Sequence, residues 1–144
     1  MRTILYTCDI SSIRAVLGRD HIYDTMSYDG SPSLQEYVPT GVWLILMQEE
    51  DICGAINLEP MNNVMWQAHI AIFPEFRGHG SEEWGKLAAQ WMRTNGASKI
   101  LAITPYESAK RYAERMGMHN VCVLPHSIRK NGKLLDQYML EMNL

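Results

Sequence analysis

The sequence predicts an α/β domain, also describable as α+β, in which one mixed β-sheet is flanked by helices. Apolar patterns of strand and helix length follow one another in the order β α α β β β α β α β β. A short polar connection joins residues 42–47 to 52–58, which indicates an antiparallel hairpin. A helix separates the strands expected at 64–73 and 99–103, so this pair should be parallel. The 144 residues match one ordinary domain, and we expect residues 1–144 to fold as one.

The N-terminal third begins with a strand over residues 2–7. A short helix should follow, with Asp9 or Ser11 as its N-cap. Its apolar residues have helical spacing: Ile13, Val16 and Leu17. Residues 21–37 are predicted to form a helix–turn–helix, in which the segment 29–32 is the turn.

The remaining elements follow the strand at 64–73. A helix over 82–94 has Ser81 as its predicted N-cap and Asn95-Gly96 as its stop. Its apolar residues form one stripe: Trp84, Leu87, Ala88, Trp91 and Met92. The later elements are a strand at 99–103, a helix at 108–116, and strands at 121–124 and 135–142 that Asn131-Gly132 joins as a hairpin.

Composition and charge exclude several classes of protein. Apolar residues are 47% and charged residues 20% of the chain, as in soluble globular domains. A net charge of −3, with no basic run longer than Arg129-Lys130, disfavours nucleic-acid binding. The uncharged apolar stretch 41–47 is too short to span a membrane, and residues 1–5 are too short for a signal peptide. Three widely spaced cysteines predict neither a disulfide framework nor a metal site, so we expect a cytoplasmic protein.

The loop after the strand at 64–73 has the features of an anion-binding site. Gly78 and Gly80 let the backbone approach a ligand closely, and Arg77 and His79 add donors at the start of a helix. The alternative interpretation is a tight turn that needs a positive φ angle.

The segment Ile70-Ala71-Ile72-Phe73-Pro74-Glu75-Phe76-Arg77-Gly78-His79-Gly80 resembles the central motif of the GNAT superfamily of N-acetyltransferases. Residues 108–118 are similar to the second helix of that family, and Lys130-Asn131-Gly132-Lys133 to its last hairpin. The resemblance extends from about residue 42 to the end of the chain. It implies the GNAT fold and the transfer of an acetyl or other short acyl group from acyl-CoA to an amine.

The resemblance also implies an acetyl-CoA site. The backbone of Ile70, Ala71 and Ile72 would follow the pantetheine arm. Arg77 and the backbone amides of the loop would surround the pyrophosphate, and these loop residues are Gly78, His79, Gly80, Ser81, Glu82 and Glu83. The region 21–40 would contact the acceptor amine, whose identity the sequence does not specify.

Two positions depart from the family pattern. Glu82 stands where the loop usually has a small residue, and Glu83 follows it, so these carboxylates compete with a pyrophosphate for the helix N-terminus. The tyrosine that commonly acts as general acid is Ala113 here, with Tyr112 one residue away. We therefore expect weak cofactor binding and slow catalysis.

Few residues are candidates for the acid–base chemistry of amine acylation. His69 is a candidate base, although strand alternation places it opposite Ile70 and a structural role is the alternative. Glu59, at the end of the preceding strand, is a second candidate base, and a solvated turn carboxylate is the alternative interpretation. Tyr106 and Tyr112 are candidate hydroxyl donors.

The opening residues 2–10 and 21–24 also resemble a group of GNAT-like proteins encoded by tailed phages and prophages, some of them labelled head-assembly proteins. This similarity implies an alternative function, in which the fold serves binding or virion assembly and catalysis is weak or absent. The location would then be the host cytoplasm. Because exposed sheet edges often pair, a homodimer is one expectation.

Overall fold

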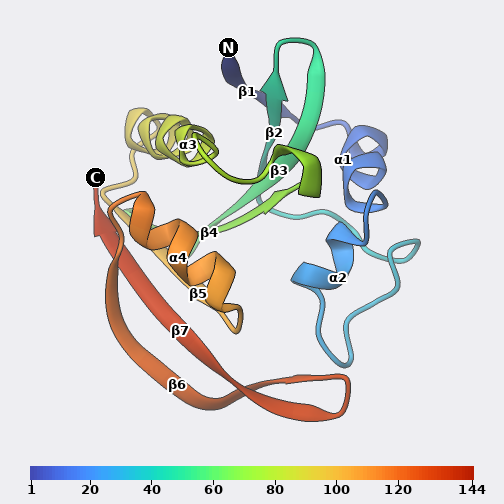
Figure 1. Ribbon diagram of the computed structural model, residues 1–144, viewed down its shortest axis with the longest axis vertical. Coiled ribbons are helices and arrows are strands. Elements are labelled where there is room, and N and C mark those ends of the chain that lie inside the picture. The colour runs from blue at the N-terminus through green and yellow to red at the C-terminus, as the bar shows by residue number, and fades with distance from the viewer.

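The computed structural model describes residues 1–144 and contains a seven-stranded sheet in the order β1-β2-β3-β4-β5-β7-β6 (Figure 1). The elements are β1 (Arg2–Thr7), α1 (Ile10–Leu17), α2 (Ile22–Met26), β2 (Val42–Gln48), β3 (Asp51–Pro60), β4 (Met65–Ile72), the 3₁₀ helix η1 (Pro74–Phe76), α3 (Glu82–Thr94), β5 (Lys99–Thr104), α4 (Glu107–Arg115), β6 (His119–Lys130) and β7 (Lys133–Asn143). The expected element order is confirmed, with η1 as an addition. No helix is both long and apolar enough to cross a membrane.

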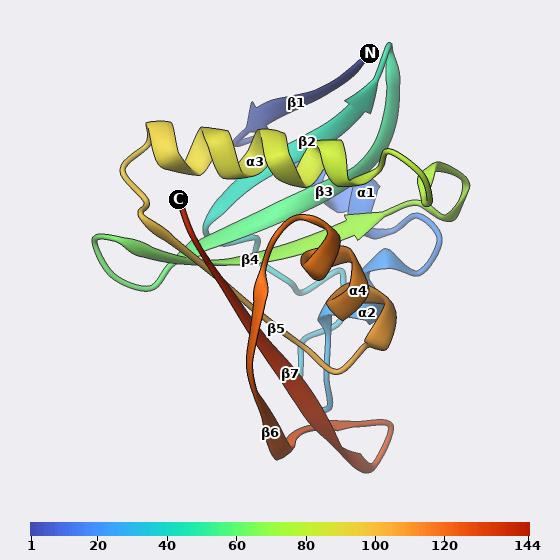
Figure 2. The same cartoon turned by 60° about the vertical axis from the view of Figure 1, so that its left-hand side comes forward.

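The sheet is mixed because one connection is a helical crossover. α3 links β4 to β5, which pair in parallel, whereas all other neighbouring strands are antiparallel. This confirms the predicted parallel pair. The strands twist strongly from β1 to β7, as Figure 2 shows.

Helices cover both faces of the sheet. Along β2, Leu44 and Leu46 point toward α3 and α4, and Trp43 and Ile45 point toward α1 and α2. All four side chains are buried, which explains why β2 is apolar without a polar alternate. The α3 and α4 side holds the larger core, and Trp84 is its largest fully buried side chain.

The prediction for residues 21–37 is wrong in its second half. Only α2 forms there, and residues 34–36 make a turn in which the N–H groups of Glu36 and Tyr37 bond the carbonyl of Ser33. Pro32 and Pro39 bracket this segment. The few residues between them are too short to nucleate a helix, and Pro39 disfavours helical backbone just before it.

The last hairpin is longer than its sequence pattern indicates. β6 begins two residues before the predicted strand 121–124 and continues six residues beyond it. Pro125 is tolerated because β6 is an edge strand and its register shifts between Leu124 and Ile128.

Candidate active site

The central feature is a gap between β4 and β5. The two strands pair only over Met65–Gln67 and Lys99–Leu101, although β4 continues to Ile72 and β5 to Thr104. Beyond this point the edge of β4 that faces β5 has no strand partner. Backbone N–H and C=O groups on that edge are free to bond an extended ligand.

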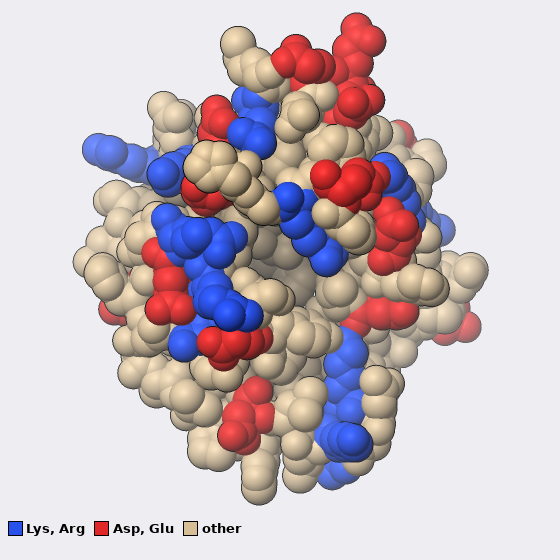
Figure 3. All heavy atoms as spheres, viewed as in Figure 1, with Lys and Arg blue, Asp and Glu red and all other residues tan.

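A cleft of about 640 Å³ occupies the gap and reaches both faces of the sheet. On one face it is bordered by the α2 region through Asp20, Asp24 and Thr25. On the other face its walls come from the loop before α3, from α3 and from α4. Figure 3 shows the hollow with Lys and Arg side chains around its rim. The basic residues that line it are Arg77, Arg111, Arg115 and Lys130.

The loop before α3 presents unpaired N–H groups. Gly78 and Gly80 have φ angles of +110° and +84°, which L side chains rarely adopt. The backbone N–H groups of Gly78, His79 and Gly80 form no hydrogen bond within the protein. Arg77 donates from Nε to the Ile72 carbonyl at 2.8 Å, which fixes its guanidinium beside the end of β4. The loop is therefore able to bind an anion at the start of a 13-residue helix.

Ser81 does not cap α3, contrary to the sequence prediction. Its backbone is already helical, with φ −64° and ψ −24°, and its side chain makes no capping hydrogen bond. A capping side chain needs extended backbone to turn back toward the first helical N–H groups. Ser81 is instead 1% exposed, and its carbonyl accepts a 2.8 Å hydrogen bond from the Tyr112 hydroxyl.

The two acidic residues at the start of α3 have different surroundings. The pKa of Glu82 is lowered, first by a hydrogen bond from its own backbone N–H and then by the nearby charge of Arg115. This carboxylate therefore lies on the helix N-terminus as a competing anion. Glu83 accepts a 3.3 Å hydrogen bond from the guanidinium of Arg2 in β1.

His69 lies in the middle of β4 and faces α2, on the side opposite Ile70, as the alternation predicts. Its Nε2 is shielded from solvent and has no hydrogen-bond partner. Burial, assisted by the charge of Lys130, lowers the pKa of His69 to about 4. The imidazole is thus neutral at pH 7 and keeps a lone pair for a proton.

Tyr106 and Lys130 meet at the end of β5. Both line the cleft, and the Lys130 ammonium lies 5.4 Å from the centre of the Tyr106 ring. The backbone N–H of Tyr106 bonds Thr104 Oγ1 at 3.1 Å, and its hydroxyl has no partner in the protein. The Tyr106 hydroxyl is therefore available to a ligand in the cleft.

Tyr112 also lines the cleft, but its hydroxyl is occupied by Ser81. Burial raises the pKa of Tyr112 above its usual range. Ala113 is buried beside it. Tyr112 therefore connects α4 to the first turn of α3, and proton donation to a ligand would break that connection.

The structure brings most of the sequence-predicted site residues to one cleft. Its lining includes Ile70, Ala71, Ile72, Arg77, Gly78 and Ser81 together with His69, Tyr106 and Tyr112. His79, Gly80, Glu82 and Glu83 lie outside this lining. Glu59 is also elsewhere, where it accepts a hydrogen bond from Thr40. Sequence reasoning missed Arg2, Arg111, Arg115 and Lys130, whose relevance depends on which strands and helices become neighbours.

Solved structures of N-acetyltransferases share this fold over the whole chain. A phosphinothricin acetyltransferase of the GNAT superfamily from Sinorhizobium meliloti, solved with acetyl-CoA, has a TM-score of 0.77 at 16% identity, with 99% of this chain and 88% of that chain covered. A spermidine N-acetyltransferase from Vibrio cholerae, solved with CoA and spermine, has a TM-score of 0.79 at 17% identity, with 99% of this chain and 95% of that chain covered. A ribosomal-protein-alanine N-acetyltransferase from Brucella melitensis has 0.75 at 14%, with 99% of both chains covered.

These likenesses confirm the fold that the resemblance implied. No protein-family model matches the sequence. No curated protein matches it either.

Proposed function

We propose that this protein transfers an acetyl or other short acyl group from acyl-CoA to an amine. The observation that carries the proposal is the cleft through the divergent β4 and β5, which leads to a loop with three unbonded N–H groups. Structures with the same fold contain acetyl-CoA or CoA, and their named substrates include phosphinothricin and spermidine. Fold alone does not assign an activity, so the argument rests on this chain's own residues.

The residues present fit acyl-CoA. The loop N–H groups of Gly78, His79 and Gly80 would hold the pyrophosphate, with Arg77 alongside. Arg111 and Arg115 supply further positive charge in the same cleft. On the free edge of β4, the backbone groups of Ile70 and the N–H of Ile72 would bond the amides of the pantetheine arm. Ala71 directs its backbone groups to β3, and Arg77 occupies the Ile72 carbonyl, so the part of the arm site predicted at these two positions is not available. Ser81, Glu82 and Glu83 follow at the start of α3, where the N–H groups of Ser81 and Glu83 already bond the carbonyls of Gly78 and Gly80, so these two amides are not available to the pyrophosphate.

The acid–base roles fall to His69 and Tyr106. Bound acyl-CoA supplies a thioester, and attack by the amine nitrogen forms an amide and releases CoA as a thiol. His69, neutral and on the α2 face, is the base that we assign to the proton that the amine loses. Its pKa of about 4 makes it a weak base, in line with the slow catalysis expected from the sequence. Tyr106, on the opposite side of the gap, gives a proton to the departing sulfur. Tyr112 positions the start of α3.

Calorimetric titration with acetyl-CoA tests the binding step, and two glycine variants localise it. Gly78 and Gly96 both have φ near +100° and open space where a Cβ would lie, but only Gly78 lines the cleft. Gly78→Asp should abolish binding by placing a carboxylate among the phosphate donors. Gly96→Asp should bear the same backbone strain and leave the affinity unchanged. Equal affinities in the two variants would mean that the loop is only a turn.

A second candidate function is binding or virion assembly by a phage-encoded protein that retains the fold. Two observations favour it: the Glu82 carboxylate on the helix N-terminus, and Ala113 in place of a tyrosine. Calorimetry separates the two functions, because a folded wild-type protein that binds no acyl-CoA rejects the enzyme and leaves the binding or assembly function. Acylation of any amine in a panel, measured by the release of free thiol from acyl-CoA, supports the enzyme.

Location and assembly are part of the proposal. Cys8, Cys53 and Cys122 are free thiols, which suits a reducing cytoplasm, or the host cytoplasm for a phage protein. β1 and β6 are the two edges of the sheet. A homodimer would be formed by pairing at one of these edges, and sedimentation equilibrium distinguishes it from a monomer.

A further inference from the structure

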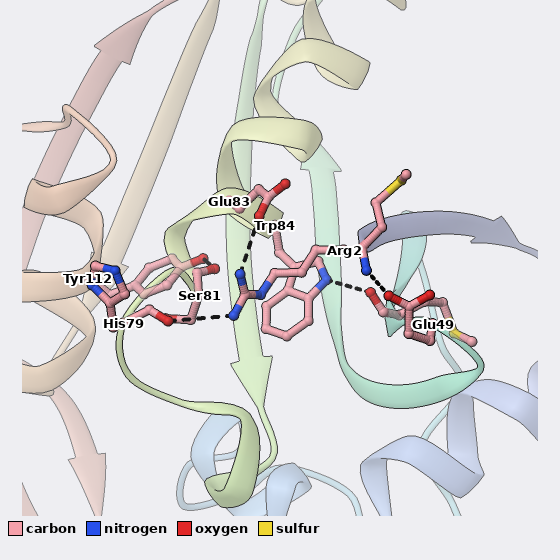
Figure 4. Close-up of polar contacts among 9 residues, drawn as sticks. Arg2, Glu49, His79, Ser81, Glu83, Trp84 and Tyr112 are labelled. Carbon is pink, nitrogen blue, oxygen red and sulfur yellow. Dashed lines mark hydrogen bonds and ion pairs between the residues drawn. The ribbon is translucent and has the colours of Figure 1, made fainter.

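Arg2, the first residue of β1, lies against the phosphate-binding loop (residues 77–81) although it is far from that loop in sequence. Its Nη1 donates to Glu83 Oε2 at 3.3 Å, and its Nη2 donates to the His79 carbonyl at 3.5 Å (Figure 4). Its guanidinium also lies 5.1 Å from the centre of the Trp84 ring. All three contacts are with the loop or the first turn of α3.

The position of Arg2 is fixed from both sides. Its backbone pairs with Gln48 of β2. The Trp84 ring beneath its guanidinium is held by a 2.9 Å hydrogen bond from Nε1 to the Met47 carbonyl. A Cβ at position 80 would lie 2.7 Å from Arg2 Nη1, so the guanidinium packs directly against the backbone of Gly80, whose positive φ favours glycine.

The contact with His79 orients the next N–H group. In a trans peptide unit the carbonyl of one residue and the N–H of the next point in opposite directions. When Arg2 holds the His79 carbonyl, the N–H of Gly80 must point away from Arg2. That N–H has no partner within the protein, so it is available to an anion.

The contact with Glu83 changes the charge at the helix N-terminus. A free carboxylate in the first turn would repel a phosphate that binds to the same end of the helix. Pairing with the Arg2 guanidinium, whose side chain is 26% exposed, offsets that negative charge. Of the two acidic residues in this turn, only Glu82 then opposes an anion.

We propose that Arg2 is a positioning residue for the loop, which it holds in an anion-binding conformation while it neutralises Glu83. This inference rests on the proposed function, because it assigns the loop to the pyrophosphate of CoA. Arg2 acts through the loop and not by contact with the ligand. It should therefore affect only ligands that carry the pyrophosphate.

The test compares the dissociation constants of two ligands by calorimetry, acetyl-CoA and S-acetylpantetheine, which lacks the pyrophosphate. Arg2→Ala should weaken acetyl-CoA binding about tenfold, the scale of one lost charge-assisted hydrogen bond, and leave S-acetylpantetheine unchanged. Arg2→Lys should retain the charge but lose the contact through two nitrogen atoms. Its affinity for acetyl-CoA should lie between those of the wild type and Arg2→Ala. When Glu83→Gln is added to Arg2→Ala, the affinity for acetyl-CoA should recover several-fold, because the uncompensated carboxylate is removed.

Arg19→Ala is the matched control. Arg19 also lies over an aromatic ring, Phe73, and pairs with a carboxylate, Glu75, but it is outside the cleft. It should leave both affinities unchanged.

Three results would overturn the inference about Arg2 while the proposed function stands. They are an unchanged acetyl-CoA affinity in Arg2→Ala, an equal loss for both ligands, and no recovery with Glu83→Gln. A wild-type protein that binds neither ligand would reject the proposed function and the inference with it. Far-UV circular dichroism of each variant reports folding, and Arg2→Lys carries the test if Arg2→Ala does not fold.

Discussion

His69 shows how the surroundings of one residue set its protonation. Burial and the charge of Lys130 hold its pKa at about 4, whereas an unfolded chain gives the ordinary value of 6.5. Between these values the unfolded state binds more protons than the folded state. The free energy of unfolding therefore falls as the pH decreases from about 6.5 to 4, by at most about 3 kcal/mol from this residue.

His69→Gln should flatten that part of the pH dependence. Urea denaturation at pH 7.5, 6 and 5 should show a smaller loss of stability in the variant than in the wild type. His119→Gln, the same substitution at an exposed position, is the control. Equal pH dependence in wild type and His69→Gln would show that the His69 environment does not resist protonation.

The two tyrosines at the cleft should respond differently to the loss of a hydroxyl. Tyr106→Phe should lower kcat about 10²–10⁴-fold, the usual contribution of a general acid, with an unchanged denaturation midpoint. Tyr112→Phe should lower stability by about 1 kcal/mol, because the Ser81 carbonyl loses its donor, with little change in kcat. The reverse pattern, measured by thiol release and urea denaturation, would assign proton donation to Tyr112.

At the scale of elements, the first turn of α3 combines a helix N-terminus with a competing carboxylate. Glu82→Gln keeps the size of the side chain and removes its charge. CoA binding should tighten about two- to five-fold, because an anion near a helix N-terminus is worth about 0.3–1 kcal/mol. Calorimetry measures this change. Glu107→Gln in the first turn of α4 is the control, and weaker CoA binding in Glu82→Gln would show that Glu82 helps to hold the ligand.

The elements differ in how far their sequence predicts them. The bounds of α3 match the prediction because both features that define the helix, the apolar stripe and the Asn95-Gly96 stop, depend only on neighbouring residues in the sequence. The sequence pattern underestimates the length of β6 because an exposed edge strand has no apolar alternation, and because Pro125 is a residue that usually ends a strand. The backbone geometry of the loop at residues 77–81 follows from local sequence, because its glycines and the start of the next helix are contiguous. The positions of Arg2 and Lys130 do not, because strand pairing and the hairpin bring them to the site from the two ends of the chain.

At the scale of the whole molecule, the tip of the β6–β7 hairpin is tied to the segment after α2. The Asp29 carboxylate accepts hydrogen bonds from the N–H groups of Asn131 and Gly132, at 2.9 and 2.8 Å. The Lys130 ammonium donates to the Ser27 carbonyl at 3.1 Å and also to the Asp24 carbonyl. Figure 1 shows this turn beside the segment after α2. Because Asp24 and Lys130 both line the cleft, this connection borders its α2 side.

Asp29→Ala should therefore affect the acceptor and spare CoA. Loss of both backbone hydrogen bonds should free the hairpin tip, speed amide exchange at Asn131 and Gly132, and displace Lys130 from the cleft. We expect KM for the amine to rise several-fold while the Kd for acetyl-CoA is unchanged, since the phosphate-binding loop lies on the other face. Asp136→Ala is the control, because Asp136 accepts one N–H, from His126, within the same hairpin. Faster exchange with an unaltered KM would show that the connection stabilises the hairpin without shaping the acceptor site, and a parallel loss of CoA affinity would show that the two faces of the cleft are not independent.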